Sequence, residues 1–169
     1  MLIDSITNVR RELKFFEEVA AKYDLKLEAE EVSEGVKRYR DLFFRTAEGI
    51  ERHEQGIICG LVVLWGTEKC YLEAWRYAAS QAPALAGQGD ADGGALRKQF
   101  IPNWTSKEFE EFVDRIGRFV DELWKEDSGF VSRNVTGAVD KPGPMLKRVL
   151  EAIWKELLDV ETVFWPVVD

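Results

Sequence analysis

The stretch TSKEFEEFVDRIGRFVDEL, residues 105–123, carries the strongest helical pattern in the sequence. Its apolar residues recur at steps of three and four, which places them on one face of an α-helix, while charged residues occupy most other positions. Glu108 stands three residues after Thr105, the spacing of a capping box, so the pattern predicts a helix that begins at Thr105 or Ser106. The apolar stripe consists of Phe109, Phe112, Val113, Ile116, Phe119, Val120 and Leu123.

Four further segments show helical periodicity, and no segment shows the alternation of apolar and polar residues that is typical of a strand. The third of these segments is the longest and is apolar on most sides, as expected for a helix surrounded by others. Ser33 is the expected N-cap of the second helix and Gly49 its end. The pattern predicts an all-α helical bundle that forms one domain over residues 1–169. The predicted helices are 3–22, 33–49, 51–80 and 145–164, with loops at 81–94 and 128–144.

Composition and charge restrict the class of protein. With 169 residues, of which 46% are hydrophobic, the chain is long enough for one ordinary domain. The net charge of -8 argues against a nucleic-acid surface, because phosphate binding requires clustered lysine and arginine. Cys59 and Cys70 are too far apart on a shared helix to form a disulfide, which predicts thiols in a reducing compartment. No run is long enough to cross a bilayer and no secretion signal is recognisable, so we expect a cytoplasmic protein without a membrane partner.

The sequence has few of the residues that several kinds of catalytic or metal site require. His53 is the one histidine and there is no Cys-x-x-Cys motif, so neither a zinc site nor a histidine-assisted nucleophile is predicted. We expect His53 to be a surface or capping residue near the start of a helix. The string GQGDADGG lacks the spaced ligands of a calcium loop, and no glycine-rich phosphate loop follows a strand.

Two glutamates stand among aromatic residues at helical spacing. Glu68 shares a helix face with Tyr71 and Trp75, and Glu161 shares a face with Phe164 and with aliphatic residues. If the two faces meet, the carboxylates share a low-dielectric pocket in which one pKa rises, and the pair then supplies one proton donor and one base. That arrangement suits cleavage of a C–N bond, in which the departing amine is protonated and a water is activated.

The same spacing also fits a purely structural role. Glutamates beside tryptophan and tyrosine on a helix are commonly found at the edge of the core, with the carboxylate in water or beside a lysine. Tyr39 and Trp104 could stack on a flat ring in a pocket or pack in the core, and packing is the commoner role. Cys59 and Cys70 have no base nearby in the sequence, which favours buried thiols over nucleophiles. Periodicity alone leaves these alternatives open.

Five strings, taken in order, resemble the TenA/thiaminase-2 family, in particular its branch that carries glutamate in place of a nucleophilic cysteine. ITNVRRELKFFEEVAAKYDLKL is similar to a family helix, with Glu12 at its early glutamate position. In EGVKRYRDLFFRTAEG, Tyr39 falls where the family has a pocket tyrosine. In GTEKCYLEAW, Glu68 and Tyr71 match the Glu-x-x-Tyr of this branch, whereas Thr67 stands at the cysteine position.

The remaining two strings lie in the C-terminal half of the chain. In QFIPNWTSKEFEEFVDRIGRFVDEL, Trp104 stands where the glutamate branch can have tryptophan. VETVFW is similar to the family's C-terminal Glu-x-x-Phe-Trp, whose glutamate is the acid/base and corresponds to Glu161. The sequence begins after the position of two further family helices, which include a Gln-Asp-x-x-Tyr segment whose aspartate recognises the aminopyrimidine ring. No residue of this sequence inherits that aspartate's role.

The resemblance implies an N-terminally shortened, haem-oxygenase-like helical bundle that hydrolyses an aminopyrimidine in thiamin salvage or degradation. Glu161 and Glu68 would divide the acid and base work, Tyr71 would orient one of them, and Tyr39 and Trp104 would flank the ring. No metal or organic cofactor is required. The apolar face left by two missing helices implies a homo-oligomer. The alternative is a non-catalytic binding or assembly protein that has lost the pyrimidine-recognising aspartate.

Overall fold

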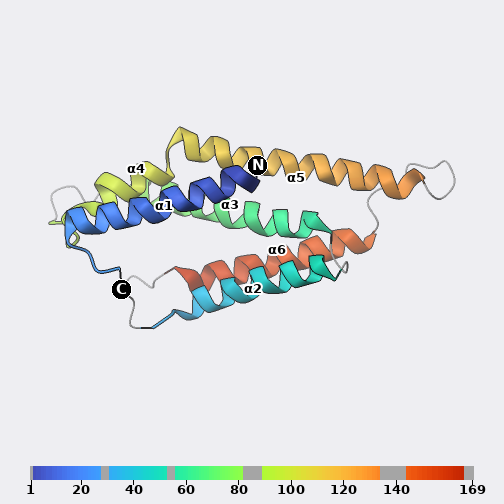
Figure 1. The fold of residues 1–169 in the computed structure, drawn as a ribbon, viewed down its shortest axis with the longest axis horizontal. Coiled ribbons are helices and arrows are strands. Elements are labelled where there is room, and N and C mark those ends of the chain that lie inside the picture. The colour runs from blue at the N-terminus through green and yellow to red at the C-terminus, as the bar shows by residue number, and fades with distance from the viewer. Residues whose placement is uncertain (1, 28–30, 53–55, 82–88, 134–143, 166–169) are drawn as a thin grey trace. The chain divides into compact units, whose positions relative to one another are not determined.

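The computed structural model describes residues 2–27, 31–52, 56–81, 89–133 and 144–165 (Figure 1). Within these ranges every regular element is a helix, so the predicted all-α class is confirmed. The haem-oxygenase-like arrangement stays a prediction. The elements in chain order are α1 (Leu2–Tyr23), α2 (Glu34–Glu51), α3 (Ile57–Gln81), the π-helix η2 (Leu96–Phe100), α4 (Ile101–Trp104), α5 (Lys107–Arg133) and α6 (Pro144–Phe164).

The chain forms two compact units. Unit 1 comprises residues 1–31 and 71–110, and unit 2 comprises residues 32–70 and 111–169. Unit 1 therefore contains α1, the C-terminal part of α3, η2 and α4, whereas unit 2 contains α2, the N-terminal part of α3, most of α5, and α6. One domain over residues 1–169 stays a prediction.

The core of unit 2 is formed around the apolar N-terminal part of α3. This part of α3 is surrounded by other apolar side chains, as its sequence predicted, and α2 packs along α6 (Figure 1). Cys59 is fully buried in this core and Cys70 is half-buried, and the two thiols are not joined in a disulfide, as predicted. The buried core consists of Leu42 from α2, Ile58, Cys59, Val62 and Val63 from α3, and Ile153 and Leu157 from α6.

The core of unit 1 is aromatic. Trp104 is 2% exposed and stacks on Phe100, with ring centroids 5.5 Å apart and an interplanar angle of 7°. It also stacks on Trp75 of α3 at 5.0 Å and 24°. Phe15 and Phe16 of α1 pack against the same indole at 5.7 and 5.4 Å. Because buried rings supply large apolar areas, this cluster joins α1, α3 and the η2–α4 segment.

The predicted N-cap of α2 is confirmed, but the helix ends later than predicted. The Ser33 hydroxyl accepts the backbone N–H of Val36 at 3.3 Å, which satisfies one of the donors left free in the first turn. Gly49 does not end the helix, which continues to Glu51. Gly49 is instead a buried residue of α2, so its small size serves packing.

The capping box predicted at Thr105 is wrong, and Ser106 is the cap of α5. The Thr105 hydroxyl donates to the carbonyl of Ile101 at 2.8 Å and is therefore turned back toward α4. The Ser106 hydroxyl accepts the backbone N–H of Phe109 at 3.2 Å, which is N-cap geometry for a helix that begins at Lys107.

Part of the predicted 81–94 loop lies outside the described residues, as does His53. Within residues 89–94, the Asp92 carboxylate accepts the backbone N–H groups of Gly94 at 2.9 Å and Leu96 at 2.6 Å. Helical structure resumes immediately after this turn as η2 and α4, which the periodicity did not predict. The predicted loop at 128–144 is shorter than expected, because α5 extends to Arg133.

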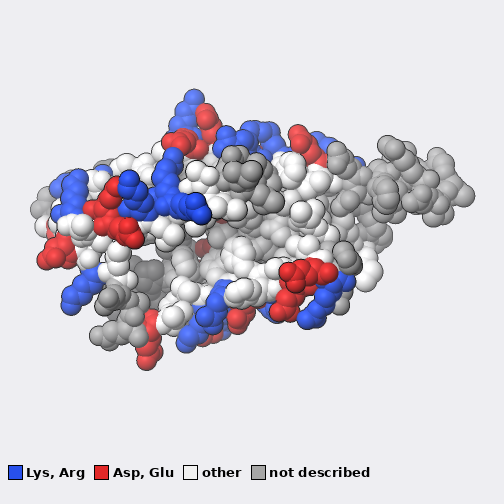
Figure 2. Space-filling view, viewed as in Figure 1, with Lys and Arg blue, Asp and Glu red and all other residues white. Residues whose placement is uncertain are grey.

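Lysine and arginine side chains are interspersed with aspartate and glutamate over the face shown in Figure 2. Exposed ion pairs join neighbouring turns of the helices, such as Arg38 with Glu34 at 2.9 Å and Lys14 with Glu18 at 3.5 Å. Such exposed pairs contribute little to stability. Within the described ranges, no helix combines the length and the apolar character needed to span a bilayer.

Candidate functional site

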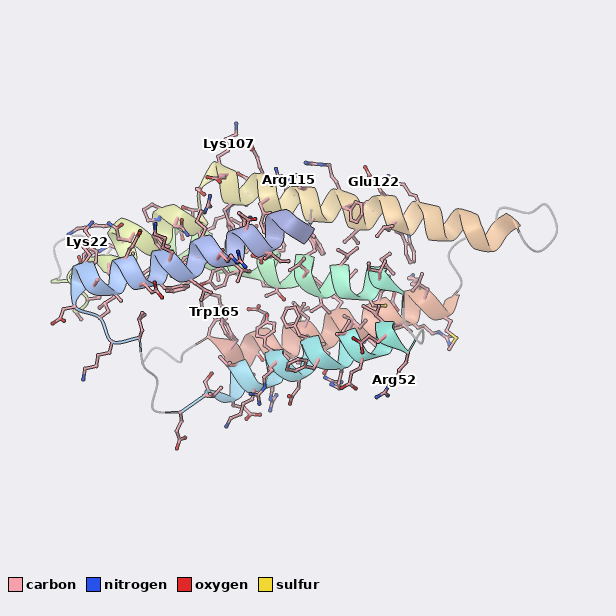
Figure 3. The ribbon with its side chains drawn as sticks, in the orientation of Figure 1. Lys22, Arg52, Lys107, Arg115, Glu122 and Trp165 are labelled. Atoms are coloured by element: carbon pink, nitrogen blue, oxygen red, sulfur yellow. The ribbon has the colours of Figure 1, made fainter. Side chains whose placement is uncertain are left out.

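Glu161 is a buried carboxylate held by two donors in unit 2. It lies near the C-terminal end of α6, and both Glu161 and Tyr39 of α2 are 8% exposed. The Tyr39 hydroxyl donates to Oε1 of Glu161. Trp165, labelled in Figure 3, follows the last residue of α6. Its indole Nε1–H donates to Oε2 of Glu161 at 2.7 Å. Since burying a carboxylate without partners is costly, these two donors explain how Glu161 is accommodated in the core.

A glycine brings α2 and α6 close enough for this contact. A Cβ on Gly35 would lie 2.4 Å from the Cα of Phe164 and 2.6 Å from the carbonyl oxygen of Val163, distances that real atoms do not adopt. Tyr39 follows Gly35 by about one helical turn, and Glu161 precedes Phe164 by nearly one turn. The close approach of the two backbones therefore brings the hydroxyl to the carboxylate. The Tyr39 and Phe164 rings pack edge to face at 5.3 Å and 85°.

The ionisation of Tyr39 is strongly disfavoured. Burial raises the pKa of Tyr39, and the hydrogen bond to Glu161 raises it further, because both effects penalise a phenolate. The Thr67 side chain on α3 lowers the pKa of Tyr39 without reversing the direction. Tyr39 is therefore a protonated donor throughout the physiological pH range. Thr67 is the residue at the position that the resemblance gives to the family's cysteine.

The second predicted catalytic residue, Glu68, lies directly after Thr67 on α3 and is half-buried. Thr67 is anchored in the helix, since its Oγ1 donates to the carbonyl of Val63 at 2.9 Å. Glu68, Glu161 and Tyr39 all belong to unit 2. The pairing of Glu68 with Glu161 stays a prediction.

The other two predicted site residues meet in unit 1. The rings of Tyr71 and Trp104 pack edge to face, with centroids 5.2 Å apart at 82°. Tyr71 also packs against Trp75 at 5.9 Å and 75°. Trp104 is a member of the aromatic core, which is the packing role that the sequence left open beside a stacking role. Tyr39 is the tyrosine that donates to Glu161, and the orienting role of Tyr71 toward one of the two glutamates stays a prediction.

Glu12 is an acidic group for which the resemblance gave the only prediction. It lies on α1 and is half-buried, and burial raises the pKa of Glu12 above its ordinary value of 4.5. The indole of Trp104 and the guanidinium of Arg11 lower this pKa, and burial prevails. The Trp104 nitrogen is nevertheless outside strict hydrogen-bond geometry with any described residue. The spacing of Glu12 from the half-buried Phe16 and the buried Val19 was the signal, since steps of four and seven place these residues on one helix face.

Trp165 and Gly35 were missed, although both carry a signal in the sequence. Trp165 stands four residues after Glu161 and therefore on the same helix face. Gly35 stands four residues before Tyr39, where a small residue on a buried face permits close helix packing. Across the described residues, no three His, Cys, Asp or Glu side chains gather closely enough to hold a metal ion.

Comparison with known proteins gives one distant similarity. No protein-family model matches the sequence, and no solved structure matches it significantly. The chain is 27% identical, over 169 aligned positions, to a protein of Fusarium pseudograminearum (strain CS3096) named "Probable transcription factor". That alignment covers 83% of this chain and 33% of the other, so the chain spans about a third of that protein's length. Membership of the TenA/thiaminase-2 family stays a prediction from the sequence strings.

Proposed function

We propose that this protein hydrolyses a C–N bond of a thiamin-derived aminopyrimidine and leaves a hydroxymethylpyrimidine. The observation that carries the proposal is the buried Glu161 carboxylate, with Tyr39 and Trp165 as donors to its two oxygens. Acid–base catalysis requires a carboxylate that is held in a fixed orientation, and these two donors hold Glu161 in one. The five sequence strings support a pyrimidine as the substrate class. Cysteines that form no disulfide support the predicted cytoplasmic setting.

In the proposed reaction, a water molecule attacks the methylene carbon of the aminomethylpyrimidine. The C–N bond breaks with its electron pair on nitrogen, and ammonia leaves. One carboxylate takes a proton from the water, and one carboxylic acid gives a proton to the departing nitrogen. We assign these two roles to Glu161 and Glu68. Tyr39 and Trp165 each occupy one lone pair on a Glu161 oxygen, and each oxygen keeps another for the transferred proton.

The assignment of Tyr71 and Trp104 to substrate binding rests on the resemblance alone and stays a prediction. Tyr39 keeps its predicted place among the substrate-binding residues and gains a second role, since its hydroxyl positions Glu161. No metal and no organic cofactor enters the proposed reaction.

The test is product identification with the purified wild-type protein. The protein is incubated with thiamin and, separately, with the aminomethylpyrimidine in water enriched in oxygen-18, and the products are followed by mass spectrometry. We expect hydroxymethylpyrimidine that carries the heavy oxygen, together with one ammonia for each aminomethylpyrimidine consumed. Product at no more than the buffer rate with both substrates would refute the proposal.

A second candidate is a non-catalytic binding domain that senses a pyrimidine. The similarity to a third of a longer protein named "Probable transcription factor" supports a role within a larger regulator. The net charge of -8 disfavours direct contact with DNA, so such a domain would sense a ligand. A rise in Tm with pyrimidine concentration, without any product, would favour this candidate. Absence of both binding and turnover would favour a structural role instead.

We further propose that the protein forms a homo-oligomer through α1. Ile6, Val9 and Leu13 share one face of this helix and are 60%, 55% and 61% exposed. Exposed apolar stripes of this kind mark interaction sites. Light scattering at increasing protein concentration should show a multiple of the chain mass, and Val9→Glu should shift the population to the monomer. A monomer at every concentration would exclude this part of the proposal.

A further inference from the structure

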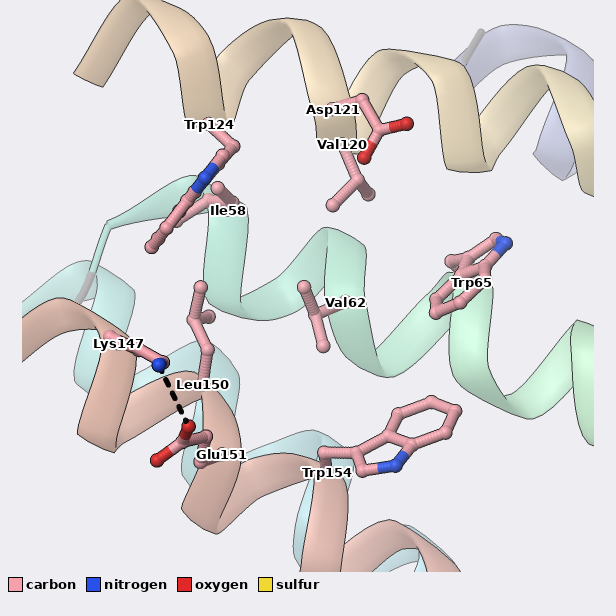
Figure 4. A pocket seen from close by; sticks show the side chains of 10 residues that line it. All are labelled: Ile58, Val62, Trp65, Val120, Asp121, Trp124, Lys147, Leu150, Glu151 and Trp154. Atoms are coloured by element: carbon pink, nitrogen blue, oxygen red, sulfur yellow. Dashed lines mark ion pairs between the residues drawn. The ribbon is translucent and has the colours of Figure 1, made fainter. Parts of the chain in front are cut away.

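Unit 2 contains a groove lined by three tryptophans. The lining residue of α6 that is nearest to Glu161 in sequence is Trp154, about two helical turns earlier. The groove is open to the surface and has a volume of ≈ 350 Å³. Trp65 of α3, Trp124 of α5 and Trp154 of α6 line it together with aliphatic side chains of the same helices (Figure 4). This volume lies within the range of small-molecule sites, roughly 300–1,000 Å³. The groove is not part of the site proposed above.

Two of the three tryptophans form a wall that is fixed by close packing. The Trp65 and Trp154 rings stack at 5.6 Å and 24°. Gly117 of α5 makes room for Trp65, because a Cβ there would lie 2.8 Å from the indole Nε1. Gly66 of α3 does the same for Trp154, since a Cβ would lie 2.9 Å from Cζ3 of its ring. The stacked indoles therefore cannot shift toward these helices, and the wall is preorganised.

The charged residues of the groove have an acidic excess. Lys147 and Glu151 of α6 form an ion pair at 3.6 Å along one side. Asp121 of α5 lines the opposite side, as Figure 4 shows. The lining thus contains two carboxylates and one ammonium, and the ammonium is already paired. Within the lining of the groove, Asp121 is therefore the carboxylate that no cation matches.

We propose that this groove binds a small organic cation with an apolar body. The faces of indole rings attract cations through their quadrupole, and tryptophan does so more strongly than other aromatic residues. The aliphatic floor removes the apolar body from water. Asp121 supplies the opposite charge at the rim, where it also attracts the cation during approach. The binding of a neutral molecule of the same shape would be stabilised only by burial of its apolar surface.

The probe is phenyltrimethylammonium, compared with its neutral isostere tert-butylbenzene. Binding is followed by titration calorimetry and by the indole N–H signals of a nitrogen-15-labelled sample, in which single Trp→Phe variants assign the signals. The cation should shift the signals of Trp65, Trp124 and Trp154 and should bind about tenfold more tightly than the isostere. Asp121→Asn should weaken cation binding several-fold and leave isostere binding unchanged.

Asp114→Asn is the matched control, because Asp114 is an exposed residue of α5 two turns before Asp121 and does not line the groove. It should bind the cation as the wild type does. The proposal would be overturned if the cation and the isostere bound equally tightly, or if Asp121→Asn bound the cation as tightly as the wild type. It would also be overturned if the three indole signals did not shift. Because Glu161 is not involved, the outcome is independent of the hydrolysis assay.

Discussion

The Tyr39 hydroxyl donates a hydrogen bond to the buried carboxylate of Glu161, across a sequence separation of 122 residues. The bond joins α2 to α6 and holds a carboxylate in a fixed orientation inside unit 2. Trp165 completes the arrangement from the end of α6. The stability of unit 2 and the proposed activity therefore depend on the same few contacts. Substitutions distinguish the two when both unfolding and turnover are measured.

Gly35→Ala should destabilise the protein by about 1–3 kcal/mol or more, because the added Cβ would overlap the backbone of α6. The helix propensity of alanine would by itself stabilise α2, so a loss of stability is diagnostic of the close approach. Urea unfolding measures the change. Gly56→Ala is the control, since its Cβ would meet only a side-chain atom of Ile58 at 3.7 Å. Equal stability of the two variants would contradict the packing described here.

Tyr39→Phe should lower the free energy of unfolding at neutral pH by about 1–3 kcal/mol, because Glu161 loses a donor in the core. The difference from wild type should shrink as the pH rises above 10. The raised pKa of Tyr39 means that its contribution is complete below the ordinary value of 10.0 and is lost at higher pH, where the unfolded chain releases the proton first. Urea unfolding from neutral to alkaline pH measures this. A difference that stays constant with pH would contradict the direction of the shift.

Glu12→Gln should raise stability at about pH 7 and have little effect at about pH 3.5. The pKa of Glu12 is raised in the folded protein. The contribution of Glu12 to the free energy of unfolding is therefore complete below pH 4.5 and is lost as the pH rises through the raised pKa. Glutamine keeps an oxygen near the Trp104 indole and carries no charge. Thermal unfolding at the two pH values measures the effect, with exposed Glu17→Gln of the same helix as the control. Destabilisation by Glu12→Gln at neutral pH would show that the Glu12 carboxylate is stabilising there.

Trp104→Ala should cost about 3–5 kcal/mol, because it removes the ring around which the aromatic core of unit 1 packs. Tyr77→Ala, at a position that is 69% exposed, should change stability by about 0.5 kcal/mol or less. Denaturant unfolding of both variants gives the comparison. A cost below about 1 kcal/mol for Trp104→Ala would mean that the indole does not hold the unit together.

The helices of this protein were largely predictable because their signals are local. The stripe in α5 and the cap at Ser33 depend on residues within one or two turns, and both are confirmed. The π-helix η2 was missed because a search for a period of 3.6 residues does not detect its wider turn. The choice of Ser106 over Thr105 depended on hydroxyl directions, which spacing does not encode.

The candidate site was predictable only in part, because its contacts join distant segments. Helical spacing placed Glu161 among apolar residues but gave no information on the helix opposite. The donor from Tyr39 follows from the packing of α2 against α6 at Gly35, which is a tertiary contact. Trp165 was accessible in principle, since it lies four residues from Glu161. The partnership of Glu68 with Glu161 stays a prediction for the same reason.

The most direct test of the account is the turnover number of Glu161→Gln for aminomethylpyrimidine hydrolysis. Asp159→Asn is the control, because Asp159 is an exposed residue on the same helix. We predict that Glu161→Gln lowers kcat by about 10²–10⁴-fold while the protein stays folded by circular dichroism, and that Asp159→Asn keeps the wild-type kcat. Wild-type turnover by a folded Glu161→Gln protein would contradict the role of Glu161 as the acid/base.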